Sequence, residues 1–190
     1  EAMVINMMLL RSMQQAKYSD LPAGHYGLAA EDYTHFTSPI RRYPDLMVHR
    51  LIHRYLVNQP SAKEIEKLEE KLPGIAEHAS KMERRAVDAE RETDALKKTE
   101  YMMDKVGEQY EGMISSITSF GIFVQLPNTV EGLISLKDLV DDYYEFNPQH
   151  MVLIGRNRGN IYRIGQKVTI EVTAVDIDER NIDFKLIKAE

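Results

Sequence analysis

The sequence predicts an α+β protein: a mostly helical part, residues 1–106, followed by a five-stranded antiparallel OB-fold barrel, residues 107–190. Two observations predict this order. Before about residue 100, apolar residues recur at steps of three and four, which is the period of a helix. After Gly107, apolar and polar residues alternate, which is the period of a half-buried strand. We therefore place the domain boundary near Gly107.

The composition is that of an ordinary globular protein, with 43% apolar and 28% charged residues. No apolar run is long enough to span a bilayer and no secretory signal is evident, so we expect no membrane partner. The chain has no cysteine, which fits a reducing compartment and predicts a cytoplasmic location. The net charge of −6 neither indicates nor excludes a nucleic-acid partner, because single-strand binding uses local grooves.

The helical part begins with a candidate helix over residues 3–18, apolar on nearly all faces. Residues 19–44 are rich in proline and glycine and are predicted to be irregular. A further helix is expected to start near Pro44, since proline suits the first turn, and to end near Asn58. Its apolar residues follow the helical period.

Ser61 followed by Glu64 forms a capping box, which predicts a short helix to about Leu72 that Pro73–Gly74 then interrupts. A long charged helix follows. It carries a narrow stripe of small and apolar residues at heptad spacing, which indicates a brace docked on another body. The stripe comprises Ile75, Ala79, Met82, Ala86, Ala89, Thr93 and Leu96.

The last eighty or so residues contain about five strands and one long loop, Asp141 to Tyr162. The clearest strand has Val168, Ile170, Val172 and Ala174 alternating with polar residues. A five-stranded barrel with a long aromatic and basic loop is typical of an OB-fold. Phe120 and Phe123 are two core residues or, if exposed beside a groove, a stacking platform for unpaired bases.

The most informative segment is YTHFTSPIRRYPDLMVHR, residues 33–50. Two prolines restrict the backbone around Arg41 and Arg42, next to the start of a helix. Forked guanidinium donors beside unpaired helix amides make a phosphate site, to which the Thr37 and Ser38 hydroxyls add donors. The alternative is a surface loop whose arginines pair with acids such as Asp45.

Two pairs of residues resemble metal ligands, and we predict a metal at neither. His49 and His53 lie four residues apart on one helix, but the glutamate of a zinc-protease motif is replaced by Arg50. Asp141 and Asp142 are adjacent acids without a third ligand in range. We interpret the acids as solvated loop residues.

Residues 33–50 resemble the signature near the end of the catalytic domain of the RNase II/RNase R family. The resemblance extends back through MMLLRSMQQAKY and GHYGLA, forward through MERRAVDAERE, and is closer to the RNase R branch. It implies processive removal of nucleotides from the 3′ end of single-stranded RNA as nucleoside 5′-monophosphates. It also implies that Arg41 contacts the phosphate near the scissile bond, that Arg42 and Tyr43 support it, and that Glu90 lies near the catalytic centre.

Residues 107–187 resemble the RNA-binding domain named after ribosomal protein S1, through GMISSITSFGIFVQL, VEGLISLKDL and IGQKVTIEVTAVDIDERNIDFKLI. The resemblance implies an OB-fold barrel with an RNA-binding surface. Where many members carry a histidine, this chain has Ser135, which removes one stacking group. The residues implied for the surface are Phe120, Phe123, Lys137, Tyr143, Tyr144 and Arg180.

The family hydrolyses phosphodiesters with Mg²⁺ held by clustered aspartates, and this chain has no such cluster. We therefore expect the Mg²⁺ ligands to lie upstream in the parent enzyme, and the 190-residue chain to be inactive alone. One alternative is a non-catalytic RNA-binding module. Another is an interaction domain whose charged helix docks on the ribosome or on a helicase. The ribosome and RNA-decay factors are also expected as partners of the parent enzyme.

Overall fold

We analysed a computed structural model that describes residue 9 and residues 12–189. By its internal contacts the chain forms two compact units. One is Met13–Glu90, and the other holds the chain from Arg91 onward. Most of the helix expected over residues 3–18 lies outside the described residues. Its last part, residues 13–18, is not helical, because the Tyr18 amide donates to the Ser80 hydroxyl at 2.9 Å rather than to a helical carbonyl.

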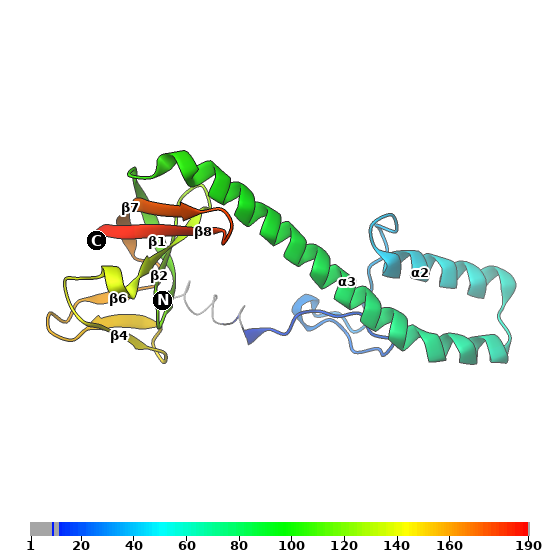
Figure 1. Cartoon of the computed structure of the whole chain (residues 1–190). Helices are drawn as coiled ribbons and strands as arrows, with labels where there is room; N and C mark the ends of the chain where they lie inside the picture. The colour runs from blue at the N-terminus through cyan, green and yellow to red at the C-terminus, as the bar shows by residue number, and fades with distance from the viewer. Residues whose placement is uncertain (1–8, 10–11, 190) are drawn as a thin grey trace. The chain divides into compact units, whose positions relative to one another are not determined.

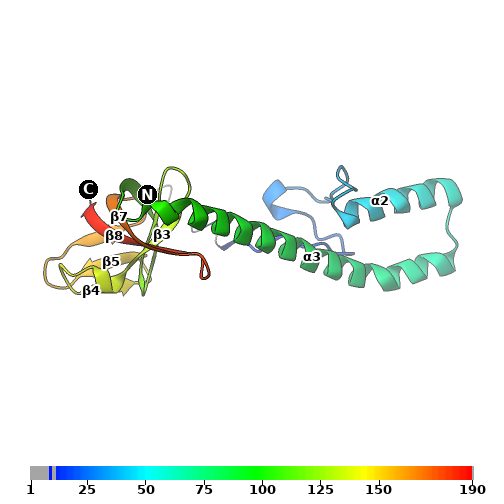
Figure 2. The same ribbon diagram turned by 45° about the horizontal axis from the view of Figure 1, so that its top comes forward.

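The first unit contains a helical hairpin, which both ribbon views show (Figures 1 and 2). It is preceded by irregular chain that includes the short 3₁₀ helix η1, Tyr26–Leu28. Helix α2 spans Tyr43–His53 and continues as a π-helical turn, η2, over Arg54–Asn58. Proline in the first turn of α2 confirms the expected start.

Helix α3 spans Ala62–Met102 without interruption and contains Pro73. The predicted break at Pro73–Gly74 is therefore wrong. Proline removes one helical hydrogen bond and crowds the preceding turn, which costs about 3 kcal/mol in a helix interior. Here Pro73 and Glu69 are both exposed, so the Glu69 carbonyl that loses its partner meets water. Burial of Ala79 and Ser80 holds the following turns in place.

The glutamate half of the predicted capping box at the start of α3 is confirmed, while the Glu64 amide donates to the Ser61 carbonyl rather than to its hydroxyl. The Glu64 carboxylate accepts hydrogen bonds from the Ser61 amide at 2.9 Å and the Ser61 hydroxyl at 2.8 Å. It also pairs with Arg54 at 2.7 Å. The Ser61 hydrogen bonds, followed by the Arg54 contact, lower the pKa of Glu64 to about 2.

Because the folded-state pKa of Glu64 is depressed, its stabilising effect is complete above its ordinary pKa of 4.5 and is lost as the pH falls towards 2. Glu64→Gln keeps the shape of the side chain but removes its negative charge. We expect this variant to melt below the wild-type protein at about pH 6 and together with it at about pH 2. Thermal melts followed by circular dichroism check this. Glu66→Gln, at an exposed neighbouring acid, is the control; an equal effect there would contradict the local capping explanation.

The second unit is built on a closed barrel whose strands follow the order β1-β2-β3-β8-β7 (Figure 1). A short 3₁₀ turn, η3, Met103–Lys105, joins α3 to the barrel. The barrel strands are β1 Gln109–Thr118, β2 Gly121–Gln125, β3 Glu131–Ser135, β7 Lys167–Asp176 and β8 Asn181–Ala189.

The expectation of a purely antiparallel barrel is wrong at one seam. Four neighbouring pairs are antiparallel, but β3 pairs with β8 in parallel, with Leu133 opposite Asp183. The long excursion between β3 and β7 brings the chain back so that β8 closes the barrel beside β3 in the same direction. The sheet is therefore mixed.

The barrel core follows the predicted alternation until the sheet bends. Val168, Ile170 and Val172 on β7 are all buried. The register of β7 against β8 then shifts between Val172 and Ala174, so Ala174 is exposed rather than buried. Such a bulge inserts one residue and reverses the side that the following side chains face.

The predicted loop over Asp141–Tyr162 folds instead into a second sheet of three short strands in the order β4-β5-β6. Figure 2 shows it beside the barrel strands. Tyr144 and Tyr162 are buried with the barrel core, which explains why the segment is ordered rather than extended in solvent. The strands are β4 Tyr144–Asn147, β5 Val152–Gly155 and β6 Ile161–Arg163, and a 3₁₀ turn, η4, Leu136–Asp138, precedes them.

Among the described residues, no helix is long and apolar enough to cross a membrane.

Candidate functional site

A buried carboxylate fixes the loop that carries Arg41 and Arg42, which is called the arginine loop below. The Ser38 carbonyl accepts from the amides of Arg41 at 3.2 Å and Arg42 at 3.0 Å, closing a turn. The Ser38 amide in turn donates to Asp45 Oδ2 at 2.7 Å, and Asp45 is fully buried in the first turn of α2. Asp45 thus holds the loop through its backbone, and within the described chain it forms no ion pair with either arginine.

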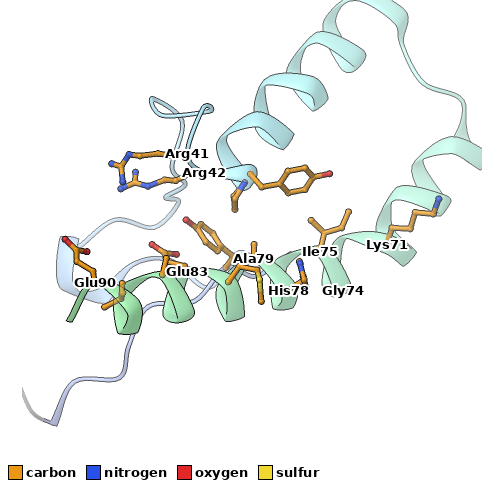
Figure 3. A pocket seen from close by; sticks show the side chains of 15 residues that line it. Arg41, Arg42, Lys71, Gly74, Ile75, His78, Ala79, Glu83 and Glu90 are labelled. Carbon is orange, nitrogen blue, oxygen red and sulfur yellow. The ribbon is translucent and has the colours of Figure 1, made fainter. Parts of the chain in front are cut away.

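The arginine loop borders a pocket of about 1030 Å³ within the first unit. Arg41, Arg42 and Tyr43 line it from the loop and α2, and Glu90 lines it from α3. Figure 3 shows the two arginines side by side above the α3 turns that carry Glu83 and Glu90. Four of the residues predicted for the catalytic site are therefore brought to one pocket.

The first part of the predicted α3 stripe lines this pocket, through Ile75, Ala79, Met82 and Ala86. Docking of the stripe on another body stays a prediction. Four further polar residues line the pocket that our sequence reasoning missed: Tyr18, Lys71, His78 and Glu83. The signal was present, because Glu83 and Glu90 lie seven residues apart and share one helix face.

Tyr18 is the most perturbed titratable group of the pocket. Its hydroxyl lies 2.7 Å from His35 Nδ1. Burial, followed by the nearby Glu83 carboxylate, raises the pKa of Tyr18 to about 12, so the hydroxyl stays protonated at neutral pH. His35 thus contacts the pocket wall through Tyr18.

Thr37 and Ser38, predicted as hydroxyl donors, are not among the residues that line the pocket in the described part of the chain. Ser38 acts through its backbone instead. His49 stacks on Phe36 with ring centroids 4.1 Å apart, and its Nε2 lies 2.8 Å from the Phe36 carbonyl. Within the described residues no group of three or more histidine, aspartate or glutamate side chains is arranged to hold a metal ion.

A second hollow, of about 640 Å³, lies in the barrel unit and is lined by Phe120, Phe123 and Arg180. Phe120 is in the β1–β2 turn and is 55% exposed, whereas Phe123 is half-buried on β2. Their rings meet edge to face, with centroids 5.8 Å apart. Gly121 between them is required, because a Cβ there would lie 2.3 Å from the Ile134 carbonyl oxygen. Phe120 is therefore exposed beside the hollow, and Phe123 is partly buried next to it.

The other residues predicted for the RNA surface lie elsewhere. Lys137 is exposed in η4, and Tyr143 is exposed with the Arg156 guanidinium over its ring at 5.1 Å. Neither lines the groove of Phe120 within the described chain. Tyr144 is only 4% exposed, and its hydroxyl donates to Asp141 at 2.9 Å. The prediction of an RNA-facing Tyr144 is thus corrected: its ring packs in the core, and burial raises its pKa.

Asp142 is also structural. Its carboxylate accepts from the amides of Tyr143, Asn157 and Arg158 at 2.6–3.1 Å. These hydrogen bonds, the Arg158 amide first, lower the pKa of Asp142. Asp142 therefore joins the chain before β4 to the β5–β6 loop, whereas Asp141 is exposed to solvent as interpreted.

Comparison with known proteins matches two family models. The RNB domain matches residues 1–58, and the S1 RNA binding domain matches residues 103–187. The chain is 52% identical to ribonuclease R 1 of Lactococcus lactis over 99% of its length, and 42% identical to Escherichia coli ribonuclease R over 100%. The chain is thus similar to ribonucleases R along nearly its whole length. It spans about a quarter of the length of these relatives, 23% and 24% respectively.

The fold agrees with solved ribonuclease R structures. The apo form of Mycoplasma genitalium RNase R superposes with a TM-score of 0.89 at 35% identity, covering 95% of this chain and 29% of the other. The same score is obtained for that enzyme in complex with ribose methylated single-stranded RNA. Its complex with double-stranded RNA gives a TM-score of 0.73 at 28% identity, covering 95% and 27%. The barrel thus lies within the S1 region of a ribonuclease R-like chain.

Proposed function

We propose that this chain is the C-terminal part of a 3′→5′ exoribonuclease that hydrolyses single-stranded RNA processively to nucleoside 5′-monophosphates. The observation that carries the proposal is the pocket in which Arg41 and Arg42 lie opposite Glu90, in a chain 52% identical to a ribonuclease R. Adjacent guanidinium groups on a rigid turn suit a phosphodiester, because their planar donors match its oxygens.

Each pocket residue has a distinct proposed role. Arg41 is more exposed than Arg42, and it contacts the phosphate at the scissile bond, where charge develops. Arg42 and Tyr43 support the neighbouring phosphate. Glu90 repels the newly formed 5′-phosphate and so favours product release, while the protonated Tyr18 hydroxyl donates a hydrogen bond within the pocket.

The hydrolytic metal, Mg²⁺ in this proposal, supplies the activated water. The described residues of the chain do not fit a Mg²⁺ site, since no three carboxylates or histidines converge there. We therefore assign no metal ligand and no metal-dependent step to this chain. We propose that the ligands belong to the remainder of the enzyme.

Two further parts of the proposal rest on sequence. We place the end of the catalytic domain at residue 106 and the RNA-binding domain at 107–190, which the start of the S1 match at residue 103 supports. We assign the protein to the cytoplasm, which the absence of cysteine supports. The ribosome and RNA-decay factors are further proposed partners.

A single-stranded RNA titration in Mg²⁺ tests the function. The 190-residue chain is expected to bind 5′-labelled RNA in a salt-sensitive manner and to leave its length unchanged. The full-length protein is expected to shorten the same RNA from its 3′ end. Shortening by the pure chain would contradict the assignment of the metal site to other residues. Failure of the full-length protein to shorten RNA would contradict the exonuclease itself.

The second candidate is a non-catalytic RNA-binding module. It is favoured by one observation, the absence of a metal-ligand cluster among the described residues. The two candidates differ in the full-length protein, which hydrolyses RNA under the first and only binds it under the second.

A further inference from the structure

The hollow lined by Phe120, called the groove here, has a second wall formed by helix α3. No motif in the sequence assigns this wall to RNA. Arg91 and Lys98 line the groove from α3, opposite Phe120 and Phe123 on the barrel. They lie seven residues apart on one helix face, about 10 Å along the axis. Both belong to the same compact unit as the barrel.

This part of α3 is fixed firmly to the barrel. Met102 is fully buried in the barrel core, and Thr99 is 1% exposed. Seven residues before Thr99 on α3, Glu92 pairs with Arg180 in the β7–β8 turn, with 3.2 Å between oxygen and nitrogen. The α3 wall therefore keeps its position relative to the aromatic pair.

Among the described residues, Arg91 and Lys98 differ from Arg180, the third cation that lines the groove, in having no partner. Within the described residues neither forms an ion pair or a hydrogen bond, whereas Arg180 is engaged by Glu92. Three acids also line the groove: Asp94, Glu131 and Asp183. The Ser115 hydroxyl donates to the Glu131 carboxylate. The groove is thus electrically mixed, with two unpaired cations on the helix side.

A site that binds single-stranded RNA combines two elements, which are cations and an exposed aromatic ring, and this groove has both. Bases stack on the ring and the cations contact backbone phosphates. We propose that α3 supplies the phosphate-holding wall of the RNA groove, through Arg91 and Lys98, while Phe120 supplies the stacking face. The acids keep the groove from becoming a general polyanion site. The inference rests on the proposed RNA-binding function and adds the residues of a second element to it.

The test is binding of a labelled mixed-sequence single-stranded RNA, on the order of 20 nucleotides, by the 190-residue chain in EDTA. Arg91→Gln combined with Lys98→Gln is expected to weaken binding on the order of tenfold at low salt. It is also expected to reduce the slope of log affinity against log salt by about 1.4, because each lost single-strand phosphate contact removes about 0.7.

The matched control combines Lys63→Gln with Lys67→Gln, which removes the same charge from exposed α3 positions outside the groove. Circular dichroism melts verify that all variants are folded. An unchanged affinity and salt slope for the Arg91/Lys98 variant, while Phe120→Ala weakens binding, would overturn the inference and leave the RNA-binding function standing. An equal loss in the Lys63/Lys67 control would also overturn it. Wild-type chain that binds no RNA would instead remove the proposed function.

Discussion

Replacing Arg41 with alanine in the full-length protein is expected to lower turnover of single-stranded RNA by about 10²- to 10³-fold, with a much smaller change in RNA affinity. Arg41 belongs to the turn that Ser38 and the buried Asp45 hold beside the pocket. A guanidinium fixed in this way is already oriented when charge develops on the phosphate, so its effect is largest in the transition state. Single-turnover decay, together with equilibrium binding in EDTA, measures the two quantities separately.

Two matched variants sharpen this experiment. Arg41→Lys keeps the charge but loses the planar fork, and it is expected to restore only part of the rate. Arg50→Ala removes an exposed arginine from α2 outside the pocket and is expected to leave turnover near wild type. If Arg41→Ala lowered affinity and turnover equally, Arg41 would be a ground-state binding residue, contrary to the proposal.

Phe184→Ala is expected to lower the free energy of unfolding of the barrel by about 3–5 kcal/mol. Phe184 on β8 is 1% exposed, and its ring packs against the backbone of Gly132 on β3. A Cβ at Gly132 would lie 2.5 Å from the ring, so the two positions are fitted to each other across the parallel seam. Truncation leaves a cavity there, because neighbouring strands that close a barrel move little.

Urea unfolding measures this change. The signal is the near-ultraviolet circular dichroism of the buried Tyr144 and Tyr162. Ile187→Ala, at a 44% exposed position on the same strand, is the control and is expected to change stability by less than about 1.5 kcal/mol. A loss for Phe184→Ala no larger than that of the control would show that the seam repacks.

Elements with local signals were predicted from the sequence. The start of α2 at its proline, the capping box of Ser61 and Glu64, and the buried side of β7 up to Val172 all depend on residues within a few positions of one another. Arg41 and Glu90 were proposed through family resemblance, and they lie 49 positions apart in the chain. Their appearance on one pocket depends on the α2–α3 hairpin.

Features that required the tertiary structure are those in which distant segments meet. The parallel pairing of β3 with β8, the burial of Tyr144, and the continuation of α3 through Pro73 each depend on contacts that no local pattern encodes. The roles of the α3 residues are a further case. A charged helix with an alanine stripe indicates only that it packs on something; the fold makes the first half of that stripe a pocket floor.

The sequence alone therefore determined the order of helical and strand regions, the start of α2, the capping residues of α3 and the resemblance to ribonuclease R, because these follow from local periodicity and short motifs. The tertiary structure decided which side chains share a site. Arg91 and Lys98 are ordinary surface cations in the sequence, and only the packing of Met102 into the barrel core brings their helix face opposite Phe120. Contacts between residues far apart in the chain depend on the α2–α3 hairpin and on the closure of the barrel, which spacing along the sequence does not specify.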